Sequence, residues 1–148
     1  MTNATLVYLF RENEILLAMK KRGFGVGKWN GVGGKVHEGE TFVEAAERET
    51  QEEIEVAVEL SEPLGQIHFH DATNEWMVHV FRTDIFSGEP TETEEMRPQW
   101  FSIDTIPYPD CWEDDQYWLP LLIAGKKFTA EVWLDAENHV TECKVAPV

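Results

Sequence analysis

The chain has 148 residues, the length of one ordinary domain, and its 43% hydrophobic and 11% aromatic content is typical of a protein that folds around a core. Its 28 acidic residues outnumber 12 Lys and Arg, so the formal net charge is −16. A chain this acidic is poorly suited to gripping a nucleic-acid polymer or an anionic membrane surface. We therefore expect one domain over residues 1–148 that acts on small molecules.

Short apolar runs predict a chain made mostly of β-strands. The expected strands are 6–10, 15–19, 65–69, 76–86, 99–101, 128–134 and 140–145. Two helices are expected as well. One begins after Thr41, which forms a capping-box pattern with Glu44, and ends near Ile54; the other covers residues 114–124 and contains Pro120. This order predicts an α/β (α+β) fold in which helices pack on a mixed sheet.

The first predicted helix carries carboxylates on the side that should face the core. Glu49, Glu52 and Glu53 project on the same side as the apolar residues of its first two turns. Like charges at this spacing repel, and carboxylates at a helix C-terminus meet the negative end of the helix dipole. A divalent cation would reverse these penalties, and an all-oxygen ligand set favours Mg²⁺ or Mn²⁺. The alternative is a solvated acidic surface.

The residues around these carboxylates match a known motif, G-x5-E-x7-R-E-U-x-E-E-x-G-U, where U is a bulky apolar residue. The matching positions are Gly34, Glu40, Arg48, Glu49, Glu52, Glu53 and Val56. The segment thus resembles the Nudix box. Two positions depart from it: Thr50 replaces an apolar residue, and Glu55 replaces the glycine that most easily adopts a left-handed conformation at a helix end. The departures bear on packing and on the helix exit, but every charged position is intact.

Further segments resemble one subfamily of Nudix hydrolases, the oxidised purine nucleoside triphosphate diphosphatases. They are residues 19–25, 29–31, 95–98 and 112–115, and the resemblance extends from about residue 5 to residue 128. It implies a mixed sheet sandwiched between helices, and Mg²⁺-dependent hydrolysis of triphosphates such as 8-oxo-dGTP and 2-hydroxy-dATP to the monophosphate and pyrophosphate. Such an enzyme sanitises the nucleotide pool. We also expect it to be a monomer.

The resemblance assigns roles to individual residues. The expected metal ligands are the Gly33 carbonyl, Glu49, Glu52, Glu53 and Glu95. Glu53 is the first choice as general base, with Glu52 or Glu95 as alternatives, and Arg48 should pair with Glu40 to brace the helix. The expected substrate-binding residues are Thr5, Lys20, Asn30, Gly34, Lys35, Phe69, Trp112, Asp114 and Asp115.

Charge and side-chain chemistry add expectations within this set. Lys20 and Lys35 can neutralise phosphates, and Trp112 offers a stacking face for a base. Asp114 and Asp115 are adjacent, so one should have a raised pKa and donate a hydrogen bond when the base binds. By contrast, Lys21 and Arg22 are expected to be surface charges. No second nitrogen ligand is expected near His68, His70 or His79, which are therefore interpreted as structural.

The sequence is also compatible with other functions. The enzyme could act on another nucleoside or pterin triphosphate, or on a broad range of them. A catalytically idle Nudix domain and a calcium-buffering acidic domain are the remaining alternatives, although no EF-hand spacing is present. Cys111 and Cys143 form no disulfide framework, and we find neither a signal peptide nor a membrane-length apolar run. We therefore expect a cytoplasmic protein.

Overall fold

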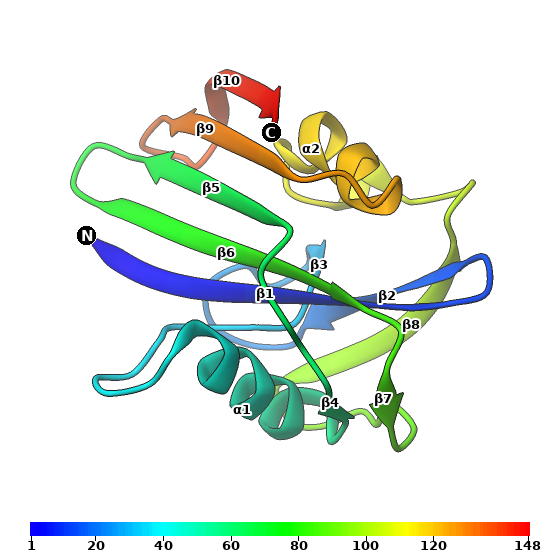
Figure 1. Cartoon of the computed structure of the whole chain (residues 1–148). Helices are drawn as coiled ribbons and strands as arrows, with labels where there is room; N and C mark the ends of the chain where they lie inside the picture. The colour runs from blue at the N-terminus through cyan, green and yellow to red at the C-terminus, as the bar shows by residue number, and fades with distance from the viewer.

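A mixed sheet between two helices organises the chain (Figure 1). The computed structural model describes all residues 1–148. The sheet has the order β10-β9-β5-β6-β1-β2-β3, with β8 paired to β2; β1 pairs with β6, and β5 with β9, in parallel. Its strands are β1 (Thr2–Arg11), β2 (Glu14–Lys20), β3 (Trp29–Asn30), β5 (Gly65–His70), β6 (Glu75–Thr83), β8 (Met96–Ser102), β9 (Phe128–Leu134) and β10 (Val140–Pro147).

The remaining elements cover this sheet or close its edges. Helix α1 (Phe42–Ile54) packs on one face and helix α2 (Asp115–Ile123) on the other, as Figure 1 shows. Strands β4 (Ala57–Val58) and β7 (Phe86–Ser87) form a separate ribbon, and a 3-10 turn covers Tyr108–Asp110. The predicted mixed sheet with helices on it is therefore confirmed. Neither helix has the length and apolar character needed to span a membrane.

Two apolar clusters, one on each face, hold these layers together. Along β1 successive side chains point to opposite faces, so Val7 and Leu9 pack in the cluster under α1 while Tyr8 packs in the cluster under α2. Tyr8 lies edge-to-face against Trp118 of α2, with ring centroids 6.0 Å apart. Both rings are fully buried, and burial of each such side chain contributes roughly 1.5–3 kcal/mol to folding.

The predicted capping box of α1 is present. The Thr41 hydroxyl oxygen accepts from the Glu44 backbone N–H at 3.1 Å, and the Glu44 carboxylate accepts from the Thr41 N–H at 2.9 Å. Both departures from the motif are accommodated. The buried Thr50 hydroxyl donates to the Ala46 carbonyl at 2.8 Å, and Glu55 adopts the left-handed conformation at φ 60° and ψ 36°. The helix therefore ends where the motif predicts, without the glycine.

The strand expected over 76–86 is interrupted. Strand β6 ends at Thr83, whose hydroxyl oxygen accepts from the Ile85 N–H at 3.0 Å, and the chain turns away before β7. The two-residue strands β3 and β4 were not expected, because two residues carry no periodic signal. Phe42, in the first turn of α1, is 38% exposed and stacks on His79.

Candidate active site

The segment before α1 runs antiparallel to β1 and brings two glycines to the carboxylate end of the helix. The Val7 N–H donates to the Val32 carbonyl at 2.6 Å, and the Thr5 N–H donates to the Gly34 carbonyl at 2.9 Å. A Cβ atom on Gly33 would lie 1.8 Å from the Thr5 carbonyl oxygen, and one on Gly34 would lie 2.8 Å from the Glu49 carboxylate. The Thr5 backbone therefore leaves room only for glycine at position 33, whereas a side chain at position 34 would displace the Glu49 carboxylate.

Glu53 lies beneath these glycines and is only 3% exposed. Its carboxylate accepts from the Gly33 N–H at 2.8 Å, and its backbone carbonyl accepts from the Thr93 hydroxyl at 2.8 Å. Burial raises the pKa of Glu53 to about 8, and the nearby carboxylates of Glu49 and Glu95 add to this, against the Gly33 N–H and Lys20. The hydrogen bond from Gly33 and the charge of Lys20 therefore only partly offset the cost of ionising this buried carboxyl group.

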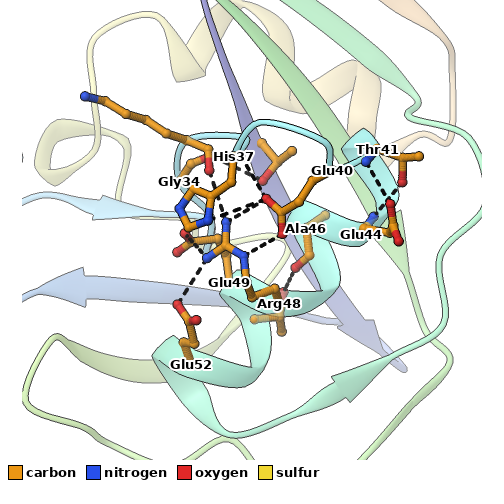
Figure 2. Close-up of polar contacts among 12 residues, drawn as sticks. Gly34, His37, Glu40, Thr41, Glu44, Ala46, Arg48, Glu49 and Glu52 are labelled. Carbon is orange, nitrogen blue, oxygen red and sulfur yellow. Dashed lines mark hydrogen bonds and ion pairs between the residues drawn. The ribbon is translucent and has the colours of Figure 1, made fainter.

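Arg48 donates hydrogen bonds to three carboxylates, those of Glu40, Glu49 and Glu52, as Figure 2 shows. Its Nε and Nη2 donate to the two Glu40 oxygens at 2.7 and 3.0 Å, and Nη1 donates to Glu49 at 2.8 Å and to Glu52 at 3.2 Å. Hydrogen bonds from Arg48 are the main reason that the pKa of Glu40 falls to about 2. The expected Glu40–Arg48 contact is thus present, and Nη2 also donates to the Lys35 carbonyl at 3.2 Å.

Glu95 lies in the loop before β8 and adds to the raised pKa of Glu53. Lys21 and Arg22 are surface charges, as expected, with side chains 37% and 64% exposed. Lys21 Nζ donates to Glu92 at 2.6 Å and to the Thr93 carbonyl at 2.9 Å, so Lys21 binds this loop. Arg22 Nη2 lies 3.8 Å from Glu95, an exposed pair that contributes little to stability.

These acidic side chains offer oxygen ligands only. Glu49 and Glu53 are largely buried, whereas the Glu52 and Glu95 side chains are 57% and 51% exposed. The group of carboxylates is therefore buried at one end and open to solvent at the other. A buried carboxylate with a raised pKa beside two further carboxylates is the arrangement that a hard divalent cation stabilises. The donor chemistry therefore fits Mg²⁺ or Mn²⁺.

A cavity of about 550 Å³ adjoins the two glycines. All nine residues predicted to bind substrate line it: Thr5, Lys20, Asn30, Gly34, Lys35, Phe69, Trp112, Asp114 and Asp115. Gly33 and a third lysine, Lys28, line it too. The cavity thus runs from the carboxylate end of α1 to the N-terminus of α2, between segments far apart in the chain.

Two aromatic residues line the cavity although the sequence did not predict them as site residues. Phe24 stacks on Trp112 with ring centroids 5.3 Å apart, although Phe24 is 68% exposed. Trp76 lies on β6 two residues before Val78, and both line the cavity. The alternation of β6 could have indicated Trp76, since residues two apart in a strand share a face.

Polar groups at the inner end of the cavity are held in fixed orientations. The Asn30 carbonyl oxygen accepts from the Tyr8 hydroxyl at 3.1 Å and from the Gly31 N–H at 2.9 Å. Asp114 accepts from the Trp118 indole N–H at 2.7 Å. Burial raises the pKa of both acids; that of Asp115 lies well above its usual range, because it is fully enclosed and adjoins Asp114.

The structure also corrects the expectation for His68 and His70. They lie side by side on β5, and a carboxylate of β9, Glu131, completes a group whose nitrogen and oxygen atoms lie within 4.8 Å of one another. Alternation along the strand puts residues 68 and 70 on one face, so a second nitrogen ligand is within reach. His79 is 3% exposed and packs against Phe42, as a structural histidine would.

Fold and site together define a Nudix hydrolase: the NUDIX domain family matches residues 1–145, and the chain belongs to it. The oxidized purine nucleoside triphosphate hydrolase of Mus musculus is 51% identical over 126 residues, which cover 84% of this chain and 81% of that protein. The protein of the same name from Danio rerio is 45% identical over 97% of this chain and 94% of its own length. A MutT protein from Bacillus halodurans shares the fold, with a TM-score of 0.86 at 19% identity over 98% of this chain and 97% of its own.

Proposed function

We propose that this protein hydrolyses oxidised purine nucleoside triphosphates to the monophosphate and pyrophosphate, using Mg²⁺, and that residues 1–148 act as one domain in a monomer. The observation that carries the proposal is one cavity lined by Asn30, Asp114 and Asp115 and also by Gly33, whose N–H donates to the Glu53 carboxylate of α1. The names of the mouse and zebrafish relatives support the same substrate class. Every group that the proposal needs comes from one chain.

The inner end of the cavity supplies the groups that would read a purine edge. Two donors occupy the Asn30 carbonyl oxygen, so its amide nitrogen is left to donate to the base. Asp114 accepts from an indole N–H, as an ionised carboxylate does. Asp115 is then the acid that stays protonated and donates, because a second buried charge beside Asp114 would cost too much. Trp112 would stack on the base.

The outer end of the cavity supplies the groups for the triphosphate. Lys20 and Lys35 line the cavity and would attract phosphates to an otherwise acidic protein, while Lys28, which also lines it, lies near Cys111 and Glu113. A divalent cation held by Glu49, Glu52, Glu53, Glu95 and the Gly33 carbonyl would neutralise phosphate charge and lower the pKa of water. The pKa of about 8 is that of Glu53 in the metal-free protein; a bound cation would lower it, so Glu53 would be ionised near neutral pH and could accept a proton from water. Arg48 positions Glu49 and Glu52 by hydrogen bonds.

The substrate preference is tested by measuring kcat/KM for 8-oxo-dGTP, 2-hydroxy-dATP, dGTP, dATP and a pterin triphosphate with Mg²⁺. We expect at least a roughly 10-fold preference for the oxidised purines, because the buried acids pair only with a matching edge. Equal rates on oxidised and normal dGTP would show a broad-specificity enzyme instead. A higher kcat/KM for the pterin triphosphate would contradict the proposed substrate class.

The assignment of Glu53 is tested by Glu53→Gln, with Glu47→Gln on the same helix as the control. Loss of the base and of a metal ligand should reduce turnover at least 100-fold at saturating Mg²⁺, as is usual for such groups. The control should hydrolyse substrate at the wild-type rate. Unchanged turnover in Glu53→Gln would mean that the carboxylates do not act in hydrolysis.

The protonated state of Asp115 is tested by binding of 8-oxo-dGMP in the absence of metal. We expect the affinity to fall as the pH rises from about 6 to about 9, because deprotonation of Asp115 removes a donor and adds a buried charge. Asp115→Asn keeps a donor at every pH, so its affinity should vary little over this range. An equally flat titration in the wild type would contradict the proposal.

A further inference from the structure

Two histidines and two carboxylates gather on the face of the sheet that is turned away from the nucleotide cavity. His68 and His70 flank Phe69 on β5; Phe69 lines the cavity, so the two imidazoles point to the other face. Strand register places Glu131 of β9 beside His68 and Glu75 of β6 beside His70. Three neighbouring strands thus converge on one point.

Three side chains of this cluster lie at distances suited to ligands around one ion. His70 Nε2 lies 2.8 Å and His68 Nδ1 3.8 Å from the same Glu131 oxygen. Tetrahedral zinc, with ligand bonds of about 2.0–2.1 Å, separates its ligands by about 3.3 Å, and these two separations bracket that value. Glu75 lies on the other side of the rings, with its Oε1 3.2 Å from His70 Nδ1 and 3.6 Å from His68 Nε2.

Ion pairing alone satisfies only one of the two histidines. A protonated His70 can donate to Glu131 and to Glu75, but the His68 ring is 3.9 Å from it between centroids, so a second proton there would be repelled. His68 Nε2 is buried and makes no hydrogen bond. Lys144 of β10 extends over the Trp133 ring at 5.3 Å and forms no ion pair with Glu131. A divalent cation would join His68, His70 and Glu131, and His70 would still donate to Glu75 from its other nitrogen.

The surroundings hold the ligands in place. The Trp133 ring stacks on His70 at 5.1 Å with an interplanar angle of 7°, which fixes the plane of that imidazole. The ligands project from hydrogen-bonded strands, which hold a site more rigidly than loops do. The side chains of His68 and His70 are only 24% and 20% exposed, so the ring nitrogens are already largely removed from water.

We propose that His68 Nδ1, His70 Nε2 and Glu131 bind a zinc-class transition metal ion, with Glu75 accepting a hydrogen bond from the other ring nitrogen of His70. Two imidazole nitrogens with a carboxylate oxygen are a ligand set that Zn²⁺ accepts and Mg²⁺ does not favour. The site is separate from the all-oxygen cluster at the end of α1. Bound zinc would tie β5 and β9 together behind Phe69, which is a wall of the nucleotide cavity.

Zinc titration by calorimetry, in the presence of saturating MgCl₂, tests this site apart from the carboxylates of α1. We expect one zinc per chain, and bands typical of tetrahedral nitrogen and oxygen coordination when Co²⁺ replaces zinc. At a zinc concentration about 100-fold above Kd, the melting temperature should rise by about 5 °C. The His68→Gln/His70→Gln double variant should bind zinc at least 10-fold more weakly and keep its Mg²⁺-dependent turnover.

His139→Gln is the matched control, because His139 is a surface histidine that pairs with Glu113 at 2.7 Å but has no second imidazole beside it. It should bind zinc like the wild type. Melting in EDTA shows that each variant is folded. The proposal is overturned if wild-type zinc binding is weaker than about 1 mM, or if the double variant retains it.

Discussion

The carboxyl group of Glu53 lies at the end of α1 with 3% of the residue exposed, where only the Gly33 N–H and the charge of Lys20 offset its burial. An ionised group there destabilises the metal-free protein, because little water remains to solvate it. The same position gives the proposed base a pKa near neutral pH. One buried residue therefore carries both a stability penalty and the proposed chemistry.

Glu53→Gln should stabilise the metal-free protein at alkaline pH. Because the pKa is about 8 when folded and near 4.5 when unfolded, the native state binds more protons between these values, and the wild-type free energy of unfolding falls as pH rises through them. Relative to Glu53→Gln, the wild type should lose roughly 2–4 kcal/mol between about pH 5 and about pH 8.5. Urea unfolding in EDTA measures this. Parallel pH profiles for the two proteins would contradict the assigned burial.

At the scale of the element, helix α1 is the part of the fold most directly encoded by local sequence. Its start follows from the reciprocal bonds of Thr41 and Glu44, and its end occurs at Ile54 as expected. Glu55 then adopts a left-handed conformation that costs an L-residue roughly 1–2 kcal/mol. The contacts of the helix evidently outweigh this local strain.

Glu55→Gly should therefore make the protein more stable. Glycine removes the left-handed strain but loses more chain entropy on folding, so we expect a net gain of about 0.5–1 kcal/mol in chemical unfolding. Glu55→Ala removes the carboxylate and keeps the strained conformation, so it should show no such gain. Equal stabilisation by both variants would assign the effect to the charge instead of the backbone.

The whole molecule combines strong net charge with local charge separation. Three of its 12 basic residues, Lys20, Lys28 and Lys35, line the cavity, and the Glu53 carboxylate of α1 accepts from Gly33 of the cavity wall. A net charge of −16 repels itself in the folded state, and added salt screens that repulsion. The acidic surface and the proposed polyanionic substrate are compatible because lysines and divalent cations lie between them.

Salt should stabilise the metal-free protein. Raising NaCl from about 0.1 M to about 1 M shortens the Debye length from about 10 Å to about 3 Å, so the melting temperature in EDTA should increase. A variant in which the exposed Glu62, Glu89 and Glu137 are replaced by lysine should respond less, since it repels itself less. An equal salt response in both proteins would mean that salt acts through hydrophobic burial.

The sequence by itself determined the two helices, the main strands and the residues of the motif, because each depends on local periodicity or on fixed spacing. The nine residues expected at the substrate also line one cavity, although that expectation came from resemblance to a family. Within the site, the contact between Glu40 and Arg48 is present as the family resemblance implied.

Only the tertiary structure decided which distant segments meet. The pairing of residues 32–36 with β1 leaves Gly33 no room for a side chain, and the Glu49 carboxylate of α1 lies against Gly34. The buried environment that sets the pKa of Glu53, and the placement of Glu131 beside His68 and His70, likewise depend on contacts between strands and loops far apart in the chain. Residue spacing along the sequence does not encode such long-range contacts, so their consequences appear only when the sheet has formed.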